Sequence, residues 1–275
     1  MQRNHFLKNI GLLSAMAWLS PKAFAAAKPT RIQFLRHATL VLEMNGKRFL
    51  IDPMLSGKDA MDPVKITRNT SRIPMTSLPI DEAVIKKLVA QVDAVVVTHT
   101  HRDHWDEAAR QLLDKNITII CQPSDEQTIR AQGFQQVLPV ASFLNYKGMT
   151  IHRTGGQHGT GDIGQRMGVV SGFVFQGEKK CYVAGDTIWC AEVEQALREH
   201  QPNVIVLNAG AAQFDQGDPI TMTADEVTKV CHALPKSQVI AVHMDTVNHC
   251  ALTRNDLRQQ LKTRQLNTQC LVPTD

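Results

Sequence analysis

The sequence is short of features that several classes of protein need. Its six cysteines include no C-x-x-C pair, which argues against a structural zinc knuckle. It has no run of like charges of the kind that nucleic-acid-binding proteins carry. No low-complexity segment and no linker rich in glycine, serine or proline divides it. What remains is a chain of 275 residues, 43% hydrophobic and 20% charged, which is typical of a globular protein with a sizeable core.

The N-terminal segment has no acidic residue and differs from the rest of the chain. Arg3 and Lys8 precede an apolar run over residues 10–19, and an A-x-A pattern ends at Ala25. This layout predicts a secretory signal peptide over residues 1–25. The apolar run is shorter than the about 20 residues that span a bilayer. An N-terminal membrane anchor or a buried helix is the alternative interpretation.

Export changes the charge of the chain. Removing Arg3, Lys8 and Lys22 from the 30 basic residues leaves 27, against 26 acidic residues. We therefore expect no nucleic-acid partner and, after processing, no stable membrane span. The piece RNHFLK resembles a twin-arginine export signal with Asn4 in place of the second arginine, which leaves the export route open. The predicted location is the periplasm or the medium.

The pattern of elements predicts a layered α/β fold in one domain over residues 26–275. Residues 31–53 are predicted to form a β meander with a two-residue hairpin at Asn45-Gly46, and helices and strands then alternate. A second strand-rich stretch begins at residue 148 and again gives way to alternating helices and strands. This order favours sheets with helices outside. Residues 53–80 form the longest irregular stretch, which is typical of a functional loop or a lid.

Residues 95–106, VVVTHTHRDHWD, place three histidines and two aspartates directly after an apolar strand. Strand ends of α/β proteins are where ligands bind, and imidazole and carboxylate are ligands of zinc and similar metals. His99 and His101 point the same way in an extended segment, whereas Asp103 and His104 begin a turn. One loop can therefore serve two metals, about 3.5–4 Å apart, that share a bridging hydroxide.

Further ligands are expected at other strand ends, because each metal needs about three protein ligands and an open position. His158 lies in the glycine-rich turn TGGQHGTGD, Asp186 follows a strand in CYVAGDT, and His243 ends a strand in VIAVHMDT. Asp186 has two carboxylate oxygens, so it is able to bridge both metals.

These motifs, in this order, resemble those of the metallo-β-lactamase fold superfamily over residues 31 to about 265. The resemblance implies a four-layered αββα sandwich with a dinuclear site between its sheets. It implies that Asp186 bridges, that the first metal takes His99, His101 and His158, and that the second takes Asp103, His104 and His243.

The opening RHATLVLEMNGKRFLIDP is similar to one branch of this superfamily. That branch includes ascorbate-6-phosphate lactonase and the N-acylphosphatidylethanolamine phospholipase D family, whose members usually carry glycine where this chain has Arg36. True β-lactamases lack the bridging aspartate, so Asp186 argues against that activity.

We therefore predict an exported hydrolase in which a metal-bridged hydroxide attacks a carbonyl carbon or a phosphorus. Asp103 would orient this nucleophile, and His249 would protonate the leaving group or bind substrate. Two divalent ions are expected, zinc first, with manganese or iron as alternatives. The expected substrate is a small or lipid-like phosphodiester, or a lactone or other cyclic ester. The sequence does not set the oligomeric state.

Three other functions stay open at this point. One is a metal-bound binding protein without turnover, and another is a cytosolic sugar-phosphate lactonase if the leader is not cleaved. The third is a di-iron oxidoreductase, although relatives of that kind usually carry an acidic residue where this chain has His101.

Several residues beside the motifs have two interpretations each. His37 either faces the site or is structural, and Asp52 either orients a metal-binding histidine or forms an Asp-Pro turn. Trp105 and Trp189 either wall the pocket or pack in the core. A disulfide between Cys190 and Cys250 would require their loops to meet.

Overall fold

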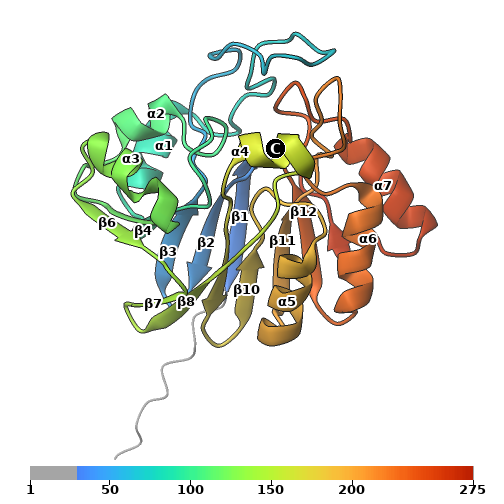
Figure 1. The fold of residues 1–275 in the computed structure, drawn as a ribbon. Coiled ribbons are helices and arrows are strands. Elements are labelled where there is room, and N and C mark those ends of the chain that lie inside the picture. The colour runs from blue at the N-terminus through green and yellow to red at the C-terminus, as the bar shows by residue number, and fades with distance from the viewer. Residues whose placement is uncertain (1–29, 275) are drawn as a thin grey trace, which may run out of the picture.

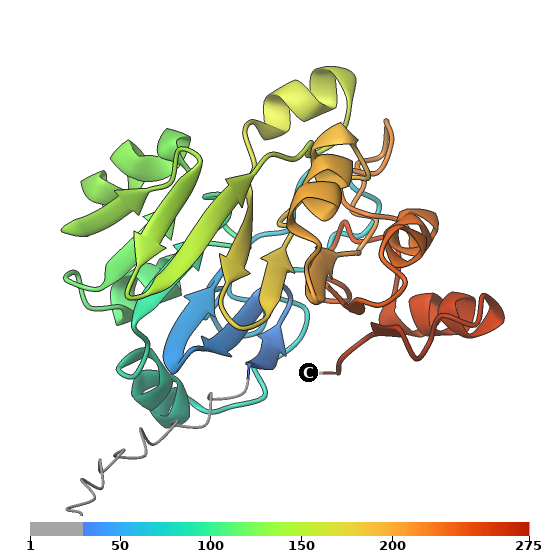
Figure 2. The ribbon, with the colours of Figure 1, turned by 90° about the horizontal axis from the view of Figure 1, so that it is seen from below.

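The computed structural model describes residues 30–274, so the predicted leader lies outside the described part of the chain. Two β-sheets face each other, and helices cover the outer face of each (Figure 1). Seen from below, the blue strands of the first sheet lie next to the yellow-green strands of the second (Figure 2). Within residues 30–274, no helix has the length and apolar character needed to cross a membrane.

The first sheet has six strands in sequence order, antiparallel at its start and parallel from the third strand on. Its strands are β1 (Arg31–Arg36), β2 (Thr39–Met44), β3 (Lys47–Ile51), β4 (Ala94–Val97), β5 (Thr118–Cys121) and β6 (Gln136–Pro139). The connections after β3 hold α1 (Glu82–Val89), α2 (Glu107–Leu112), the short 3-10 helix η1 (Pro123–Asp125) and α3 (Glu126–Ala131).

The second sheet has seven strands, also in sequence order, and repeats the change from antiparallel to parallel pairing. Its strands are β7 (Phe143–Tyr146), β8 (Met149–Thr154), β9 (Gly172–Gln176), β10 (Lys180–Val183), β11 (Val204–Asn208), β12 (Gln238–Val242) and β13 (Cys270–Leu271). Its helices are α4 (Gly161–Met167), α5 (Ala191–His200), α6 (Ala224–Ala233) and α7 (Arg254–Thr263).

Most of the buried apolar side chains form three layers that hold this arrangement together. The middle layer lies between the sheets, where Phe49 and Phe175 meet with ring centroids 5.2 Å apart. A second layer joins the first sheet to α1, α2 and α3, and a third joins the other sheet to α5, α6 and α7. Burying each large apolar side chain contributes about 1.5–3 kcal/mol. The predicted four-layered αββα sandwich is confirmed.

Helix capping ties the long loop over residues 53–80 to the site region. Asp106 is the N-cap of α2, and its Oδ1 accepts from the backbone N–H of Ala109 at 2.7 Å. Its Oδ2 accepts from both the backbone N–H and the hydroxyl of Ser56, at 2.7 and 2.6 Å. The residue that starts the helix after the histidine loop therefore also fixes the beginning of the long loop. As expected, that loop is irregular apart from a bridge between Met61 and Ile73.

The sequence patterns did not predict four elements, β6, β7, α4 and β13. Gly161 and Gly164 lie in α4, and glycine weakens a helical signal by about 1 kcal/mol each. Pro139 ends β6, and proline disguises an edge strand. β13 has two residues, too few for a periodic pattern.

Candidate metal centre

The residues predicted to bind metal come from loops at one edge of the two sheets. His99 follows β4, His158 follows β8, Asp186 follows β10 and His243 follows β12. The carboxyl ends of the parallel strands β4, β10 and β12 lie at this edge, and so does the turn between β1 and β2. The structure brings all seven predicted ligands together here.

His99, His101 and His158 form the first group. One ring nitrogen from each lies within 4.8 Å of the others. The closest pair is His99 Nε2 and His101 Nδ1, at 2.9 Å. The side chains of His99 and His101 converge from the segment after β4, as expected for residues two apart in an extended segment.

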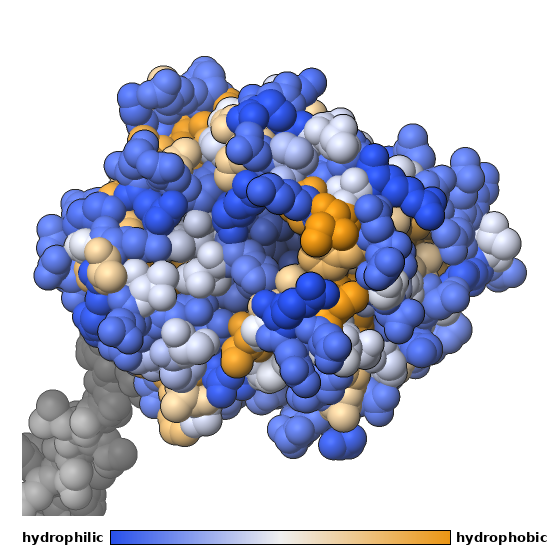
Figure 3. Space-filling view, turned by 45° about the horizontal axis from the view of Figure 1, so that its top comes forward, coloured by the Kyte–Doolittle hydropathy of each residue, from blue (hydrophilic) through white to orange (hydrophobic). Residues whose placement is uncertain are grey.

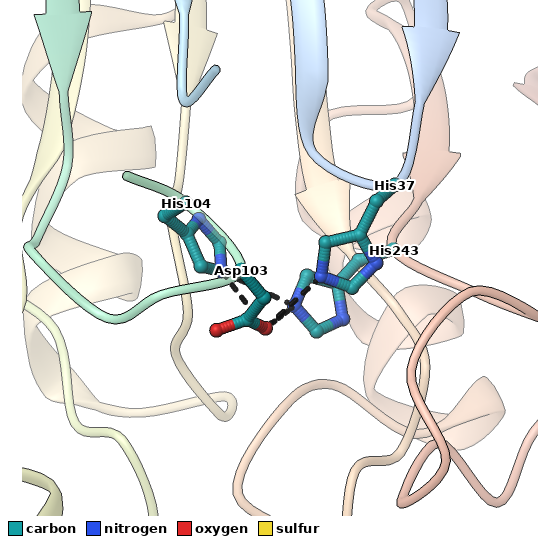
Figure 4. A group of neighbouring side chains, drawn as sticks. All are labelled: His37, Asp103, His104 and His243. Carbon is teal, nitrogen blue, oxygen red and sulfur yellow. Dashed lines mark hydrogen bonds and ion pairs between the residues drawn. The ribbon is translucent and has the colours of Figure 1, made fainter. Parts of the chain in front are cut away.

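Asp103, His104 and His243 form the second group, together with His37 (Figure 4). His104 Nε2 lies 3.2 Å from His243 Nε2. Asp103 Oδ2 lies 3.7 Å from His104 Nε2 and 3.6 Å from His243 Nε2. The His104 and Asp103 side chains come from the loop after β4 of the first sheet, and His243 comes from the second sheet.

Asp186 lies between the two groups. Its Oδ2 is 3.4 Å from His158 Nε2 and 3.2 Å from His104 Nε2. Its Oδ1 is 3.3 Å from His243 Nε2 and accepts a hydrogen bond of 2.7 Å from the Asn208 amide. One carboxylate therefore faces donor atoms of both groups, which is the position that a bridging ligand requires.

Hydrogen-bond acceptors behind the histidines fix which ring nitrogen faces the site. His104 Nδ1 lies 2.9 Å from Asp52 Oδ2, and His158 Nδ1 lies 2.8 Å from the carbonyl oxygen of Ile220. Carboxylate and carbonyl oxygens only accept, so each Nδ1 carries a proton, and Nε2 is the ring nitrogen that faces the site and can bind a metal once it holds no proton. Metal-binding histidines need this kind of support.

Asp52 is thus an orienting residue, one of the two interpretations that its sequence context left open. It is 1% exposed, and it also accepts from the backbone N–H and the hydroxyl of Thr98, at 2.8 and 2.7 Å. The Thr98 hydroxyl lies 3.1 Å from His99 Nδ1, and Cys250 Sγ lies 3.6 Å from His243 Nδ1. No motif in the sequence predicts such a role for Thr98, Cys250 or Asn208.

The buried carboxylates of the site need positive charge beside them. Burial opposes the charged form of His104, but the carboxylates of Asp186, Asp103 and Asp52 outweigh it and raise its pKa to about 10. Burial also opposes ionised Asp186, yet His104 and His243 hold the pKa of this carboxyl well below its usual range. Protonated histidines thus balance the carboxylates, and divalent ions would supply the same positive charge. The donor set fits a metal centre.

A cavity of about 200 Å³ opens onto the first group and Asp186. Figure 3 shows the hollow in this face of the molecule, with hydrophobic side chains beside it. His101, Asp103, His158 and Asp186 provide its polar part. The other lining residues are Val64, Met167, Phe214 and Ile220, which are apolar, with Arg102 and His249.

Asn248 holds the long loop against this cavity. Its Oδ1 accepts from the backbone N–H of Val64 at 2.8 Å. Its amide donates to the Val64 carbonyl at 3.0 Å and to the Thr67 hydroxyl at 2.7 Å. The 4% exposed side chain of Asn248 therefore fixes the segment that supplies one apolar wall.

His249 lies in the cavity but outside the candidate ligand groups. Its ring stacks on Phe214 with centroids 5.9 Å apart, and its buried Nδ1 has no hydrogen-bond partner within residues 30–274. Burial lowers its pKa to about 4, so the ring is neutral near pH 7. A neutral imidazole suits hydrogen bonding to substrate better than protonation of a leaving group.

The remaining candidates are structural. Trp105 is buried against Phe134 and donates to Gln132 at 2.7 Å, and Trp189 packs against the core of the second half. Neither lines the cavity over the metal centre. Cys190 and Cys250 are free thiols.

Comparison with known proteins identifies the family to which the chain belongs. A model of the beta-lactamase superfamily domain matches residues 47–244. The UPF0173 protein YddR of Bacillus subtilis (strain 168) is 37% identical over 247 residues, which cover 88% of this chain and 96% of that protein.

Two solved structures are similar to this one. The isothiocyanate hydrolase from Delia radicum gut bacteria is 38% identical, with a TM-score of 0.84 over 89% of this chain and 96% of that chain. A possible metal-dependent hydrolase from Veillonella parvula DSM 2008 is 37% identical, with a TM-score of 0.86 over 90% of this chain and 97% of that chain. Membership in the lactonase and phospholipase D branch stays a prediction. The chain belongs to the beta-lactamase superfamily and is a metal-dependent hydrolase.

Proposed function

We propose that the protein is a dinuclear hydrolase that acts on a small, uncharged electrophile, with an isothiocyanate as the first substrate to test. The observation that carries the proposal is the position of Asp186, whose two oxygens face both groups of histidines. Two divalent ions held there, zinc first and manganese or iron as alternatives, would supply an activated water and polarise the atom under attack.

The cavity supports an uncharged substrate. Four apolar side chains surround its polar part, and Arg102 is the one lysine or arginine among the lining residues within 30–274. One guanidinium nitrogen of Arg102 already donates to the Asp62 carbonyl at 2.7 Å. Arginine frequently binds a phosphate group through two parallel hydrogen bonds. The volume of about 200 Å³ suits a compact substrate.

An isothiocyanate fits these limits, and the 38% identity to an isothiocyanate hydrolase supports it. Adding water across the C=N bond gives the carbon an oxygen and the nitrogen a proton, and the thiocarbamate separates into an amine and carbonyl sulfide. Asp103, at the edge of the cavity, would orient the attacking water. His249, neutral and with a free ring nitrogen, would bind the nitrogen or sulfur of the substrate.

A lactone or another small ester is the second candidate, because its carbonyl carbon is also uncharged and needs the same groups. The phosphodiester expected from the sequence would need positive charge from the bound ions themselves, since the cavity walls offer little.

The test uses the zinc-loaded protein with three substrates, benzyl isothiocyanate, a simple lactone and bis-p-nitrophenyl phosphate. Asp186→Asn is the matched control for metal dependence. We expect isothiocyanate consumption that disappears with a chelator and returns with zinc. If only the lactone or only the phosphodiester is turned over, that compound class is the substrate and the isothiocyanate proposal is wrong. A protein with two ions and no turnover of any substrate would favour the binding-protein alternative.

We also propose that the leader over residues 1–25 directs export to the periplasm or the medium, where the substrate would be met as a free small molecule. Its charge pattern and A-x-A end support this. Cell fractionation should find a mature chain that begins near Ala26. Recovery of the full-length chain in the cytoplasm alone would contradict export and restore the cytosolic lactonase alternative.

A further inference from the structure

His37 contacts the second group of site residues through its side chain. It lies in the turn between β1 and β2, and its ring is fully buried. Its Nε2 is 3.1 Å from Asp103 Oδ2 (Figure 4). This is closer to that oxygen than His243 Nε2 at 3.6 Å or His104 Nε2 at 3.7 Å. The Asp103 carboxylate therefore has its shortest side-chain contact with a residue outside the predicted ligand set.

The same residue also holds His243. The backbone carbonyl of His37 accepts from the backbone N–H of His243 at 3.0 Å, and the two rings lie with centroids 3.7 Å apart. His37 adopts a φ of 58°, a left-handed conformation that is uncommon for residues other than glycine. Such conformations persist where the surroundings impose them, often at functional sites. His37 thus links a ligand from each sheet.

The surroundings of His37 Nδ1 decide whether His37 donates a hydrogen bond to Asp103 or is itself a ligand of the second metal. His104 and His158 each have an acceptor behind Nδ1, whereas the buried Nδ1 of His37 has no hydrogen-bond partner within residues 30–274. If Nε2 bound a metal, Nδ1 would carry a proton with no acceptor, and a buried unpaired donor is costly. With the proton on Nε2, the ring donates to Asp103 and only a lone pair is left unpaired.

We propose that His37 is a positioning residue for the second metal subsite, which holds the Asp103 carboxylate by a hydrogen bond and His243 by backbone and ring contacts. This rests on the proposed dinuclear centre. Asp103 is 13% exposed, more than the 0% of His104 and His243, so its carboxylate has the most freedom to rotate. A donor that fixes a ligating carboxylate typically raises metal affinity 10–100-fold.

The test is a titration of the metal-free protein with zinc in competition with a chromophoric chelator, which yields both stepwise dissociation constants. His37→Phe keeps a ring against His243 but cannot donate, and His37→Gln places an amide near the position of Nε2. His152→Phe is the matched control, because His152 lies outside the metal centre. We expect His37→Phe to weaken one step by about 10–100-fold, His37→Gln to recover most of it, and the control to match the wild type.

Other results separate the possibilities. Wild-type constants for both steps in His37→Phe would overturn the role of His37 while leaving the dinuclear centre intact. Loss of a whole equivalent in both variants would make His37 a ligand. A wild-type protein that binds only one ion would refute the proposed centre itself. If His37→Phe does not fold, His37→Ala with added imidazole carries the test, and imidazole must then restore the weakened step.

Discussion

Replacing Asp52 with asparagine should weaken metal binding while leaving the fold intact. Asp52 is 1% exposed, and its Oδ1 accepts from the Thr98 backbone N–H at 2.8 Å. Its Oδ2 accepts from the Thr98 hydroxyl at 2.7 Å and lies 2.9 Å from His104 Nδ1. Asparagine has the same shape but only one oxygen, so it cannot accept from both the Thr98 N–H and His104.

The metal-free variant has a way to avoid this conflict. The asparagine oxygen takes the Thr98 N–H, and its amide donates to His104 Nδ1, so this ring carries its proton on Nε2. That nitrogen faces the site, and a protonated nitrogen cannot bind a metal. Metal binding therefore forces the side-chain amide of the introduced asparagine to turn, so that its oxygen accepts from His104 Nδ1. Its NH2 group then faces the backbone N–H of Thr98, and this buried N–H loses its acceptor. An unsatisfied buried donor costs about 1–3 kcal/mol, which corresponds to an affinity loss of about 5- to 150-fold.

Competition with a chromophoric chelator measures this loss, and thermal unfolding of the metal-free protein shows that folding is preserved. Asp93→Asn is the matched control. Asp93 accepts from the Arg48 backbone N–H at 3.0 Å and pairs with Lys147, and no residue of the candidate ligand groups contacts it. Equal affinity in wild type and Asp52→Asn would refute the idea that this carboxylate sets the tautomer of His104.

Three further variants test other parts of the site. Asp186→Asn should lower the occupancy of both ions together with activity, and metal analysis showing two ions with full activity would remove it from the bridging position. His249→Ala should keep both ions and lower kcat/KM by about 2- to 13-fold, the effect of losing one hydrogen bond to the substrate of about 0.5–1.5 kcal/mol, whereas loss of an ion would make it a ligand. Asn248→Ala should raise KM more than it lowers kcat, because the segment at Val64 loses its anchor, and an unchanged KM would show that other contacts hold it.

The sequence predicted the layered fold and the chemistry of the site because both follow from local patterns. An apolar strand followed by a histidine or an aspartate places that residue at a sheet edge, whatever the rest of the chain does. His99, Asp186 and His243 all satisfy this rule and meet at one edge. The order of the motifs resembles that of a known superfamily, and this resemblance predicted the second sheet and the outer layers of helices.

The sequence could not predict contacts that depend on how the sheets meet. The turn at His37 belongs to the first sheet, and its contact with His243 exists only because the edges of both sheets come together. Asn248 contacts Val64 across 184 positions of the chain. Neither contact leaves a periodic or compositional signal, and α4 begins in a glycine-rich segment whose propensity argues against a helix.

X-ray diffraction from a zinc-loaded crystal, measured at the zinc absorption edge, tests the central claim most directly, because anomalous peaks locate each ion. The dinuclear centre predicts two peaks beside Asp186, one among His99, His101 and His158 and the other among Asp103, His104 and His243, about 3.5–4 Å apart. A single peak at full zinc loading, or two peaks that both lie away from Asp186, would contradict it.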